Sequence, residues 1–293
     1  MRRRFFAIVN PIAGVVGSKL LPAVLAALEK AGADVVAVCP SSGADARRCA
    51  GDACRSGLFD AIVAAGGDGT IRQVAAGALG TDVPIGIIPI GTGNVMAHEI
   101  GLKPNPQDVV RALLTGRVAR MRGGLVNNEP FLLMVGAGFD GRVTATLNRR
   151  MQNRFGKSAY ARPVLQALVH PLDELDVAVD GIDYHANWIV VTKSRHYGGS
   201  FVLAPQTTVF STGFYALLFQ ARSRTAHALQ LLALACGRLA ARQDVKAVPC
   251  KRVTVRCSRK TPAQIDGDAF SCTPLEVEPN SREVGVIVSA AAA

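Results

Sequence analysis

VAAGGDGTIRQVAAG, residues 63–77, changes within one short stretch from an apolar strand pattern to a helix pattern. Residues 63–65 end an apolar run, three glycines then surround Asp68, and from Thr70 the apolar spacing is helical. A glycine turn at a helix N-terminus favours an anion such as phosphate, because free backbone N–H groups and the helix dipole both point at it. The stretch therefore predicts a strand–loop–helix unit with an anion site that contains an acid.

Strand and helix patterns alternate through the first third of the chain. Apolar runs predict strands at Phe5–Asn10, Asp34–Cys39, Asp60–Ala65 and Pro84–Ile88, and helical spacing predicts helices at Leu20–Ala31, Ala44–Ser56, 70–79 and from about Asn94. This alternation is typical of a parallel sheet with crossover helices, in which ligands bind at the carboxyl ends of the strands. The loops that follow the strands should therefore converge.

The second half has a different pattern. Short strands are predicted at Phe131–Val135, Leu175–Val179, Tyr184–Thr192, Phe201–Ala204, Tyr215–Phe219, Val253–Cys257 and Leu275–Glu278, with helices at Arg142–Asn153, Ser158–Leu168 and Thr225–Arg242. Many short strands separated by turns indicate an antiparallel sandwich or barrel. We therefore predict an α/β domain over 1–125 and an antiparallel β domain over 126–279. The apolar segment Glu283–Val288 is expected to rejoin the first domain, so that 280–293 completes it.

Composition limits the class of protein. At 293 residues two domains are favoured over one, and 49% hydrophobic with 19% charged residues is typical of a folded globular chain. The apolar run Phe5–Val9 is too short for a signal peptide, and no stretch has the length of a membrane span. The seven cysteines are odd in number and lack CxxC spacing, which predicts free thiols in a reducing cytoplasm and disfavours zinc.

Positive charge is concentrated in the second half. The net charge is +11, of which +3 lies in residues 1–140 and +8 beyond them, and residues 141–172 and 184–243 contain no acid. This asymmetry indicates an anionic partner surface, although a solvated basic face explains any single arginine equally well. Aromatic residues are only 5% and no recognition motif accompanies the charge, which disfavours nucleic acid and favours peripheral contact with an anionic membrane.

Three further loops follow predicted strands. NPIAG (Asn10–Gly14) has a turn fixed by Pro11 and a glycine that permits close approach to a ligand. CPSSGADA (Cys39–Ala46) offers the hydroxyls of Ser41 and Ser42, for which local sequence alone favours capping of the helix that follows. In PIGTGN (Pro89–Asn94), Thr92 can donate to an oxygen, while Asn94 is a candidate helix cap.

An acid beside a phosphate loop is explained by a metal. ATP brings Mg²⁺, which prefers carboxylate, water and phosphate oxygens, so Asp68 is predicted to hold that ion or to orient the attacking hydroxyl. Without a metal, the carboxylate would repel the phosphates. The structural alternative is that Asp68 caps the helix beginning near Thr70, and the two roles are compatible.

Together, NPIAG, GGDGTIRQV and PIGTGN resemble the diacylglycerol kinase catalytic-domain family, which includes bacterial lipid kinases, sphingosine kinases and ceramide kinases. The likeness continues in GAGFDGRVT (136–144), GKSAY (156–160) and QIDGDAF (264–270), and so covers essentially the whole chain. It implies a nucleotide-binding α/β domain, a lipid-binding β-sandwich and an active site in the cleft between them. It also implies transfer of the γ-phosphate of ATP to a lipid hydroxyl, as in diacylglycerol, phosphatidylglycerol or a sphingoid base.

The resemblance also assigns residues. Those implied to contact ATP are Asn10, Pro11, Gly14, Ser41 or Ser42, Gly66, Gly67, Asp68, Gly69, Thr70 and Thr92. Asp266 matches the family's proton acceptor, and Asp268 stands where glutamate is commoner. A carboxylate within hydrogen-bond reach can take the proton of a lipid hydroxyl during phosphoryl transfer. Without the family, the DGD triplet would be interpreted as a hairpin turn with solvated acids.

The sequence departs from the family pattern at two places. Val95 follows Asn94, where many bacterial members have aspartate, and LAPQTTVFSTGF (203–214) lacks the acid that binds a structural Mg²⁺ in some members.

Two other functions are compatible with these motifs. A soluble-nucleotide kinase of the NAD kinase type also carries GGDG, and a non-catalytic nucleotide- or lipid-binding protein could retain the fold. A homodimer and peripheral attachment of a cytoplasmic protein to the membrane are both compatible with the sequence.

Overall fold

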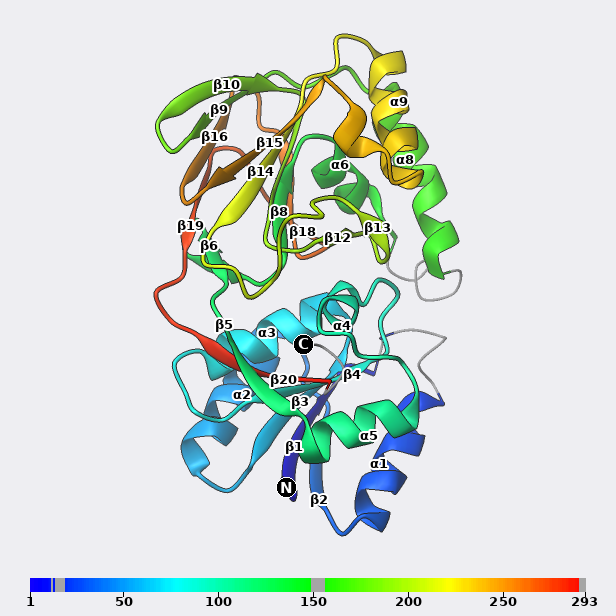
Figure 1. The fold of residues 1–293 in the computed structure, drawn as a ribbon, viewed down its shortest axis with the longest axis vertical. Helices are drawn as coiled ribbons and strands as arrows, with labels where there is room; N and C mark the ends of the chain where they lie inside the picture. The colour runs from blue at the N-terminus through cyan, green and yellow to red at the C-terminus, as the bar shows by residue number, and fades with distance from the viewer. Residues whose placement is uncertain (12, 14–18, 149–155, 290–293) are drawn as a thin grey trace. The chain divides into compact units, whose positions relative to one another are not determined.

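The structure is a computed structural model that describes residues 1–289 apart from 12, 14–18 and 149–155 (Figure 1). The chain forms two compact units, one of Met1–Arg122 with Ser281–Ala293 and one of Gly123–Asn280. We call them the first and the second unit. All seven cysteines are free thiols, as predicted.

The first unit contains a six-stranded sheet in the order β2-β1-β3-β4-β20-β5. Its strands are β1 (Arg4–Val9), β2 (Asp34–Val38), β3 (Ala61–Gly66), β4 (Ile85–Pro89), β5 (Arg117–Met121) and β20 (Val284–Val288). Neighbouring strands are parallel except that β5 runs antiparallel to β20. The closing segment of the chain is therefore a strand of this sheet, between β4 and β5. Strands β3 and β4 are buried along their whole length, as expected for a parallel sheet covered on both faces.

Helices cover the two faces of this sheet (Figure 1). They are α1 (Leu20–Lys30), α2 (Gly43–Ser56), α3 (Asp68–Ala78), α4 (Val95–Glu99) and α5 (Pro106–Thr115). Helix α2 packs against α3, and α1 packs against α5. The sequence interpretation missed α5, although Asn105 caps it by accepting from the Asp108 N–H and Pro106 occupies its first turn.

The second unit is built on two six-stranded antiparallel sheets, in the orders β10-β9-β16-β19-β6-β7 and β15-β14-β11-β8-β17-β18. The first comprises β6 (Gly124–Val126), β7 (Glu129–Phe131), β9 (Leu175–Val179), β10 (Ile182–Ala186), β16 (Val253–Cys257) and β19 (Leu275–Pro279). The second comprises β8 (Met134–Ala137), β11 (Trp188–Thr192), β14 (Phe214–Phe219), β15 (Val245–Cys250), β17 (Pro262–Ile265) and β18 (Asp268–Cys272). The predicted α/β fold with an antiparallel sandwich is confirmed.

Two predicted strands are each divided in the structure. Tyr184–Thr192 becomes β10 and β11, which belong to different sheets, because the chain crosses from one sheet to the other at Asn187. Phe131–Val135 becomes the end of β7 and the start of β8, again in different sheets. A continuous apolar run does not record where a strand changes sheet, so these divisions are not visible in the pattern.

The helices of the second unit are α6 (Phe139–Thr146), the 3₁₀ turn η2 (Gly156–Tyr160), α8 (Ala161–Val169), α9 (Arg224–Ala235) and the 3₁₀ turn η3 (Leu239–Ala241). The prediction of one helix over Thr225–Arg242 is wrong, because Gly237 adopts a left-handed φ of 67° after α9 ends. The last part of the predicted helix Arg142–Asn153 lies outside the described residues. A two-stranded ribbon joins β12 (His196–Tyr197) to β13 (Phe201–Val202).

Alternating side chains fill the space between the two sheets. Ile189 and Val191 of β11 enter this core together with Val177 of β9 and Val255 of β16. Trp188 is also fully buried, but on the other face of its sheet, where it contacts residues of α6 and α9. The second sheet is therefore covered on both faces, by the first sheet and by helices.

Candidate active site

The two glycine loops of the first unit lie in contact. Strands β3 and β4 end level with each other, with Gly66 paired to Pro89, and the Ile90 N–H donates to the Gly66 carbonyl at 3.2 Å. A Cβ at Gly91 would lie 2.4 Å from the Cα of Gly67, so only glycine fits at this approach. The predicted convergence of these loops at the carboxyl ends of the strands is therefore present.

Asp68 joins the two loops. Helix α3 begins at Asp68, so the N-cap residue of this helix is Gly67 and not Asp68. Instead, Oδ2 accepts from the Val95 N–H at 3.0 Å and Oδ1 accepts from the Met96 N–H at 2.9 Å. Asp68 is therefore not the N-cap residue of the helix that follows it, and its carboxylate satisfies the first amides of α4.

Asn94 also differs from its predicted role. Its backbone is left-handed, with φ 49°, and its side chain makes no cap bond to α4. The side-chain amide donates to the carbonyls of Gly91 at 2.8 Å and Pro89 at 3.3 Å. Asn94 therefore closes its own loop, and Asp68 supplies the cap that Asn94 leaves open.

The loop after β1 reaches the same place. The side-chain amide of Asn10 donates to Thr70 Oγ1 at 3.1 Å, and the Asn10 N–H donates to the Ala65 carbonyl at 2.9 Å. A Cβ at Gly66 would lie 2.4 Å from Thr70 Oγ1, so glycine is needed there too. Pro11 is exposed, and the predicted Gly14 lies outside the described residues. Gly67, Asp68, Gly69, Thr70 and Thr92 are all partly exposed, so the paired loops face solvent.

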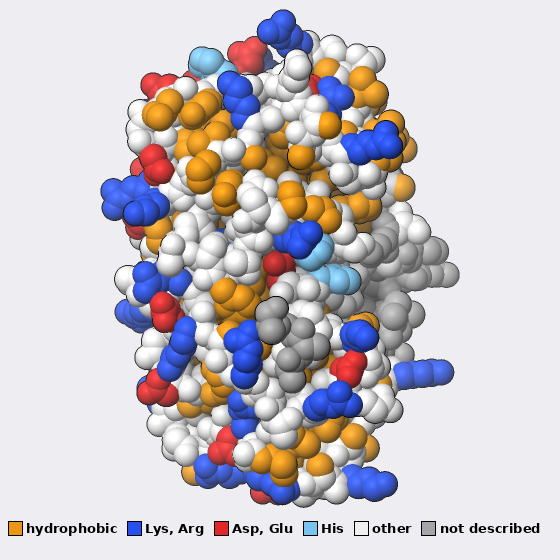
Figure 2. All heavy atoms as spheres, in the orientation of Figure 1, with side chains coloured by type: hydrophobic (Ala, Val, Ile, Leu, Met, Phe, Trp, Pro, Cys, Tyr) orange, Lys and Arg blue, Asp and Glu red, His pale blue; other side chains and the backbone are white. Residues whose placement is uncertain are grey.

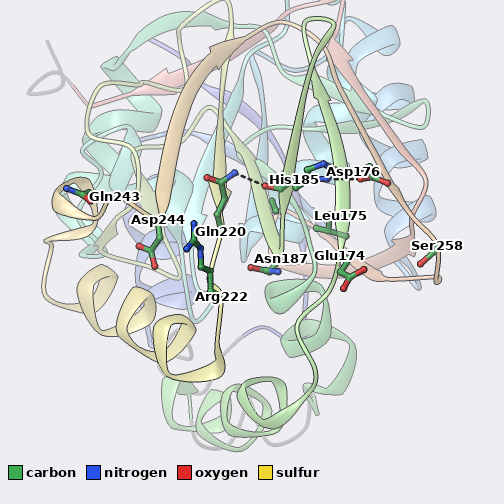
Figure 3. A pocket seen from close by; sticks show the side chains of 12 residues that line it. Glu174, Leu175, Asp176, His185, Asn187, Gln220, Arg222, Gln243, Asp244 and Ser258 are labelled. Atoms are coloured by element: carbon green, nitrogen blue, oxygen red, sulfur yellow. Dashed lines mark hydrogen bonds and ion pairs between the residues drawn. The ribbon is translucent and has the colours of Figure 1, made fainter.

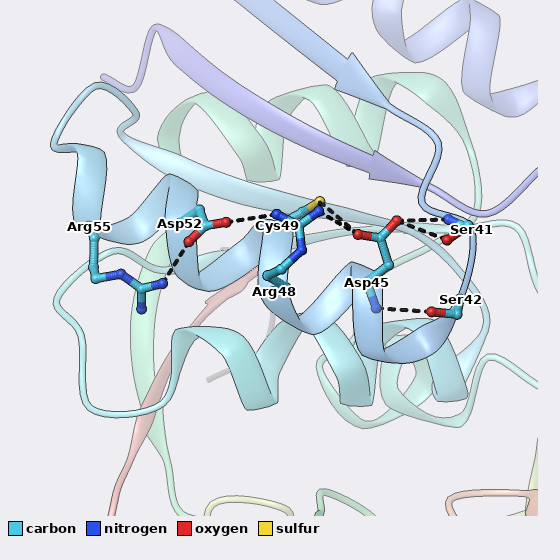
Figure 4. Close-up of polar contacts among 7 residues, drawn as sticks. All are labelled: Ser41, Ser42, Asp45, Arg48, Cys49, Asp52 and Arg55. Atoms are coloured by element: carbon cyan, nitrogen blue, oxygen red, sulfur yellow. Dashed lines mark hydrogen bonds and ion pairs between the residues drawn. The ribbon is translucent and has the colours of Figure 1, made fainter.

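Ser41 and Ser42 are engaged in capping α2 (Figure 4). The Asp45 N–H donates to Ser42 Oγ at 3.1 Å, and the Ser41 N–H and hydroxyl both donate to Asp45 Oδ2, at 2.9 and 3.2 Å. The capping interpretation of the serine pair is confirmed. Both serines are exposed, so this role leaves their hydroxyls accessible from solvent.

No three histidine, cysteine or carboxylate side chains converge on a point in the described part of the chain. Mg²⁺ at a nucleotide site needs fewer protein ligands, because one or two carboxylates act together with phosphate oxygens and water. The Asp68 carboxylate accepts from two backbone N–H groups and is partly exposed where the two loops meet. Asp68 is therefore suited to one contact with a nucleotide-bound Mg²⁺.

The second-unit acid Asp266 forms the turn between β17 and β18. Asp266 and Gly267 have φ 47° and 84°, the left-handed pair of a two-residue hairpin of type I′. The alternative interpretation of DGD as a hairpin turn is correct for the backbone, but Asp266 is not a solvated acid, because it is 5% exposed. Its carboxylate accepts from the N–H groups of Leu132, Leu133 and Met134, at 2.8, 2.8 and 2.9 Å. Asp268 begins β18 and is partly exposed.

A buried carboxyl that the sequence interpretation left without a role lies behind this hairpin. The Gln264 side-chain amide donates to Asp140 Oδ2 at 3.1 Å, and Gln264 Oε1 accepts from the Gly267 N–H at 2.8 Å. Asp140 thus connects GAGFDGRVT to QIDGDAF through one side chain. The sequence offered a signal for the role of Asp140, because its motif and that of Gln264 both belong to the family resemblance.

Burial raises the pKa of Asp140 to about 7, because loss of water disfavours the charged form. The Gln264 bond opposes this effect, and the Trp188 indole N–H lies near enough to oppose it as well. Neither Asp140 Oδ1 nor Trp188 Nε1 completes a hydrogen bond with the described residues. The folded chain therefore holds this proton more tightly than an exposed aspartate would.

A further cavity of the second unit lies away from these motifs. A cavity of about 840 Å³ opens beside β9, β10 and β14 and is lined mainly by polar side chains, among them Glu174, His185, Gln220, Arg222 and Asp244 (Figure 3). None of the site residues predicted from the sequence lines it. This cavity is therefore distinct from the two motif-bearing regions.

Comparison with known proteins assigns the family. The model of the diacylglycerol kinase catalytic domain matches residues 4–126, and that of the YegS C-terminal NAD kinase beta sandwich-like domain matches residues 133–288. The chain belongs to the diacylglycerol kinase catalytic-domain family. The predicted resemblance is confirmed, and as a member of this family the chain is a lipid kinase.

Relatives of this kinase match over most of its length. A diacylglycerol kinase of Bacillus subtilis (strain 168) is 27% identical and covers 98% of this chain and 96% of its own. A diacylglycerol kinase of Mycobacterium tuberculosis is 28% identical, over 93% and 90%. A crystal structure from Bacillus anthracis str. Sterne, described as a candidate diacylglycerol kinase, superposes with TM-score 0.82 at 20% identity, over 100% and 97%, and shows the same fold.

Proposed function

We propose that this kinase transfers the γ-phosphate of ATP to the hydroxyl of a lipid such as diacylglycerol, phosphatidylglycerol or a sphingoid base. The observation that carries the proposal is the contact between the two glycine loops, with Asp68 joining them at the N-terminus of α3. Backbone N–H groups and the positive end of a helix dipole stabilise phosphate oxygens at such a place. Family membership supports a lipid as the acceptor.

The nucleotide contacts that we propose lie around these loops. The glycines at 66, 67 and 69 bring backbone close to phosphate, and the hydroxyls of Thr70 and Thr92 can donate to phosphate oxygens. Asn10 positions Thr70 through its side-chain bond. The predicted contacts of Pro11, Gly14, Ser41 and Ser42 remain part of the proposal.

Asp68 would hold Mg²⁺, which supplies neutralisation of the charge on the transferring phosphoryl group. The support is that Asp68 is a partly exposed carboxylate at the point where the two glycine loops meet. Asp68 also fixes the second loop by holding the first amides of α4. This second task lets the same carboxylate set both the shape and the charge of the site.

Asp266 is the proposed proton acceptor, with Asp268 as its neighbour in the turn. Family resemblance supports the assignment, and the three backbone N–H donors fix the carboxylate in one orientation. The same bonds give Asp266 an anchoring task, because they tie the β17–β18 hairpin to residues 132–134. A base role and an anchoring role therefore need separate readouts.

The positive charge of the second unit supports peripheral contact with an anionic membrane, where the lipid substrate lies. None of the helices that the structure describes is long and apolar enough to cross a bilayer. The related lipid kinases favour this acceptor over a soluble dinucleotide, and they favour turnover over a non-catalytic binding role.

The experiment is Asp68→Asn, measured as lipid phosphorylation and as Mg²⁺–ATP binding by calorimetry. We expect turnover to fall by about 10²-fold or more, the usual scale for removing one electrostatic group from a transition state. Asp82→Asn is the matched control, since it removes an equal charge from a 99% exposed side chain of the same unit. Near wild-type turnover by a folded Asp68→Asn protein would exclude the proposed role.

A further inference from the structure

Helix α9 buries two polar side chains beside Leu234 and leaves two leucines exposed. His227 and Gln230, its most polar interior residues, are 4% and 0% exposed, whereas Leu229 and Leu232 are 51% and 59% exposed. An ordinary surface helix buries its apolar stripe and exposes its polar one. The burial of His227 and Gln230 and the exposure of Leu229 and Leu232 therefore each need a reason.

The buried polar residues have packing tasks. The His227 ring lies 4.9 Å from that of Phe139 and 5.9 Å from that of Trp188, over the outer face of the second sheet. Desolvation lowers the pKa of His227, so that it packs as a neutral ring. The Gln230 amide donates to the Asp244 carbonyl at 3.1 Å. Nothing comparable covers Leu229 and Leu232 among the residues that the structure describes.

Helix α8 continues the same surface. It packs against α9, and its Leu165 and Val169 are 63% and 67% exposed. We call Leu165, Val169, Leu229 and Leu232 the α8–α9 face. Figure 1 shows the two helices side by side, and over their region Figure 2 shows orange apolar side chains interspersed with blue basic ones.

The charges around the α8–α9 face have one sign. Arg162 lies in the first turn of α8, Arg224 begins α9 and Arg238 follows α9, and all three are exposed. Residues 156–172 and 221–243 contain no acid. The acids that border these segments include Asp173 and Asp244, which are paired with Arg142 and Arg242. An anionic surface therefore meets the cations with little opposing charge.

We propose that the α8–α9 face is the membrane-docking surface of this kinase, with the leucines entering the acyl region of an anionic bilayer and the arginines contacting its headgroups. Exposed leucine flanked by arginine is the pattern of an interfacial helix, in which apolar burial and headgroup attraction add. The inference rests on the membrane contact proposed above and locates it. It does not depend on which lipid is phosphorylated.

The test is co-sedimentation of the full chain, without ATP, with vesicles of phosphatidylglycerol mixed into phosphatidylcholine and with vesicles of phosphatidylcholine alone. We expect L229Q/L232Q to lose roughly tenfold in partition for each leucine, because half-exposed leucine still gains from burial in the acyl region. In R162Q/R224Q the partition into anionic vesicles should fall about fivefold for each arginine at low salt and should change little at high salt. I182Q is the matched control, since Ile182 is 61% exposed on β10 of the same unit.

Three outcomes overturn the proposal: equal binding by wild type and L229Q/L232Q, an equal loss with I182Q, or a loss of self-association without a loss of vesicle binding. The last outcome would assign the face to a second copy of the chain and is checked by sedimentation equilibrium. Thermal unfolding of each variant shows that the fold is intact. Because binding is measured without turnover, failure here leaves the proposed kinase reaction standing. A failed kinase assay likewise leaves the docking result standing.

Discussion

Replacing Asp140 with asparagine tests whether the second unit contains a carboxyl that is held neutral by burial. The side chain is 2% exposed and its pKa is raised to about 7 from an ordinary value of 3.8. The unfolded chain therefore loses this proton near pH 4 and the folded chain near pH 7. Between these values the folded state binds more protons, so the free energy of unfolding falls as pH rises.

The size of the effect follows from the shift. Raising the pKa from 3.8 to about 7 is a change of about 3 units, and at 1.36 kcal/mol per unit this corresponds to about 4 kcal/mol. This stability is present below pH 4 and is lost by pH 7 to 8. The substituted amide is neutral at every pH, so Asp140→Asn should be about 4 kcal/mol more favourable relative to wild type at pH 8 than at pH 4.

The assay is urea unfolding followed by tryptophan fluorescence at pH 4 and pH 8. Trp188 is the only tryptophan of the chain, is fully buried and stacks on Phe219 with ring centroids 3.7 Å apart, so it reports unfolding of the second unit. If the side-chain amide introduced at position 140 lowers the free energy of unfolding by a fixed amount, that amount is the same at both pH values and cancels in the comparison. Asp183→Asn, an exposed carboxylate on β10, is the control and should show no such difference. An equal effect of Asp140→Asn at both pH values would refute a buried neutral carboxyl.

Three other substitutions test the loops and the hairpin. Gly91→Ala places a Cβ 2.4 Å from the Cα of Gly67, so it should lower the free energy of unfolding by about 1–3 kcal/mol and weaken ATP binding. Gly93→Ala is the control and should be tolerated, because its nearest contact is at 3.4 Å. Calorimetry that finds the two variants alike would contradict the loop contact. Ser42→Ala removes the α2 cap and should cost about 1 kcal/mol in thermal unfolding; an unchanged KM for ATP would confine Ser42 to that role. Asp266→Asn should lower kcat by about 10²–10⁴-fold with unchanged ATP affinity and altered kcat–pH dependence, whereas a purely anchoring residue would leave the shape of that profile unchanged.

The elements that were predicted best have simple patterns. Leu175–Val179 and Val253–Cys257 have the bounds predicted for them, because each alternates apolar and polar residues with one face in the sandwich core. The glycine loop after β3 was also predictable, because glycines separate a buried strand from a helix. The β17–β18 hairpin was missed as a pair of strands, since polar residues in QIDGDAF interrupt the apolar pattern.

Partners that are distant in sequence could not be predicted. The bonds from Asp68 to the Val95 and Met96 amides depend on how β3 and β4 align, which no local pattern records. The burial of Asp266 depends on residues 132–134, more than a hundred positions earlier. The sequence therefore predicts which residue types gather at a site, whereas register decides which atoms meet.

The central claim, ATP-dependent phosphorylation of a lipid hydroxyl, is tested most directly by a lipid panel with γ-labelled ATP. Purified kinase is incubated with Mg²⁺ and with vesicles that contain diacylglycerol, phosphatidylglycerol or a sphingoid base, and the products are separated by thin-layer chromatography. We predict label in at least one phosphorylated lipid, lost when Mg²⁺ is chelated and lost in Asp68→Asn but not in Asp82→Asn. Label in none of the lipids, together with label transferred to NAD in a parallel reaction, would contradict the account.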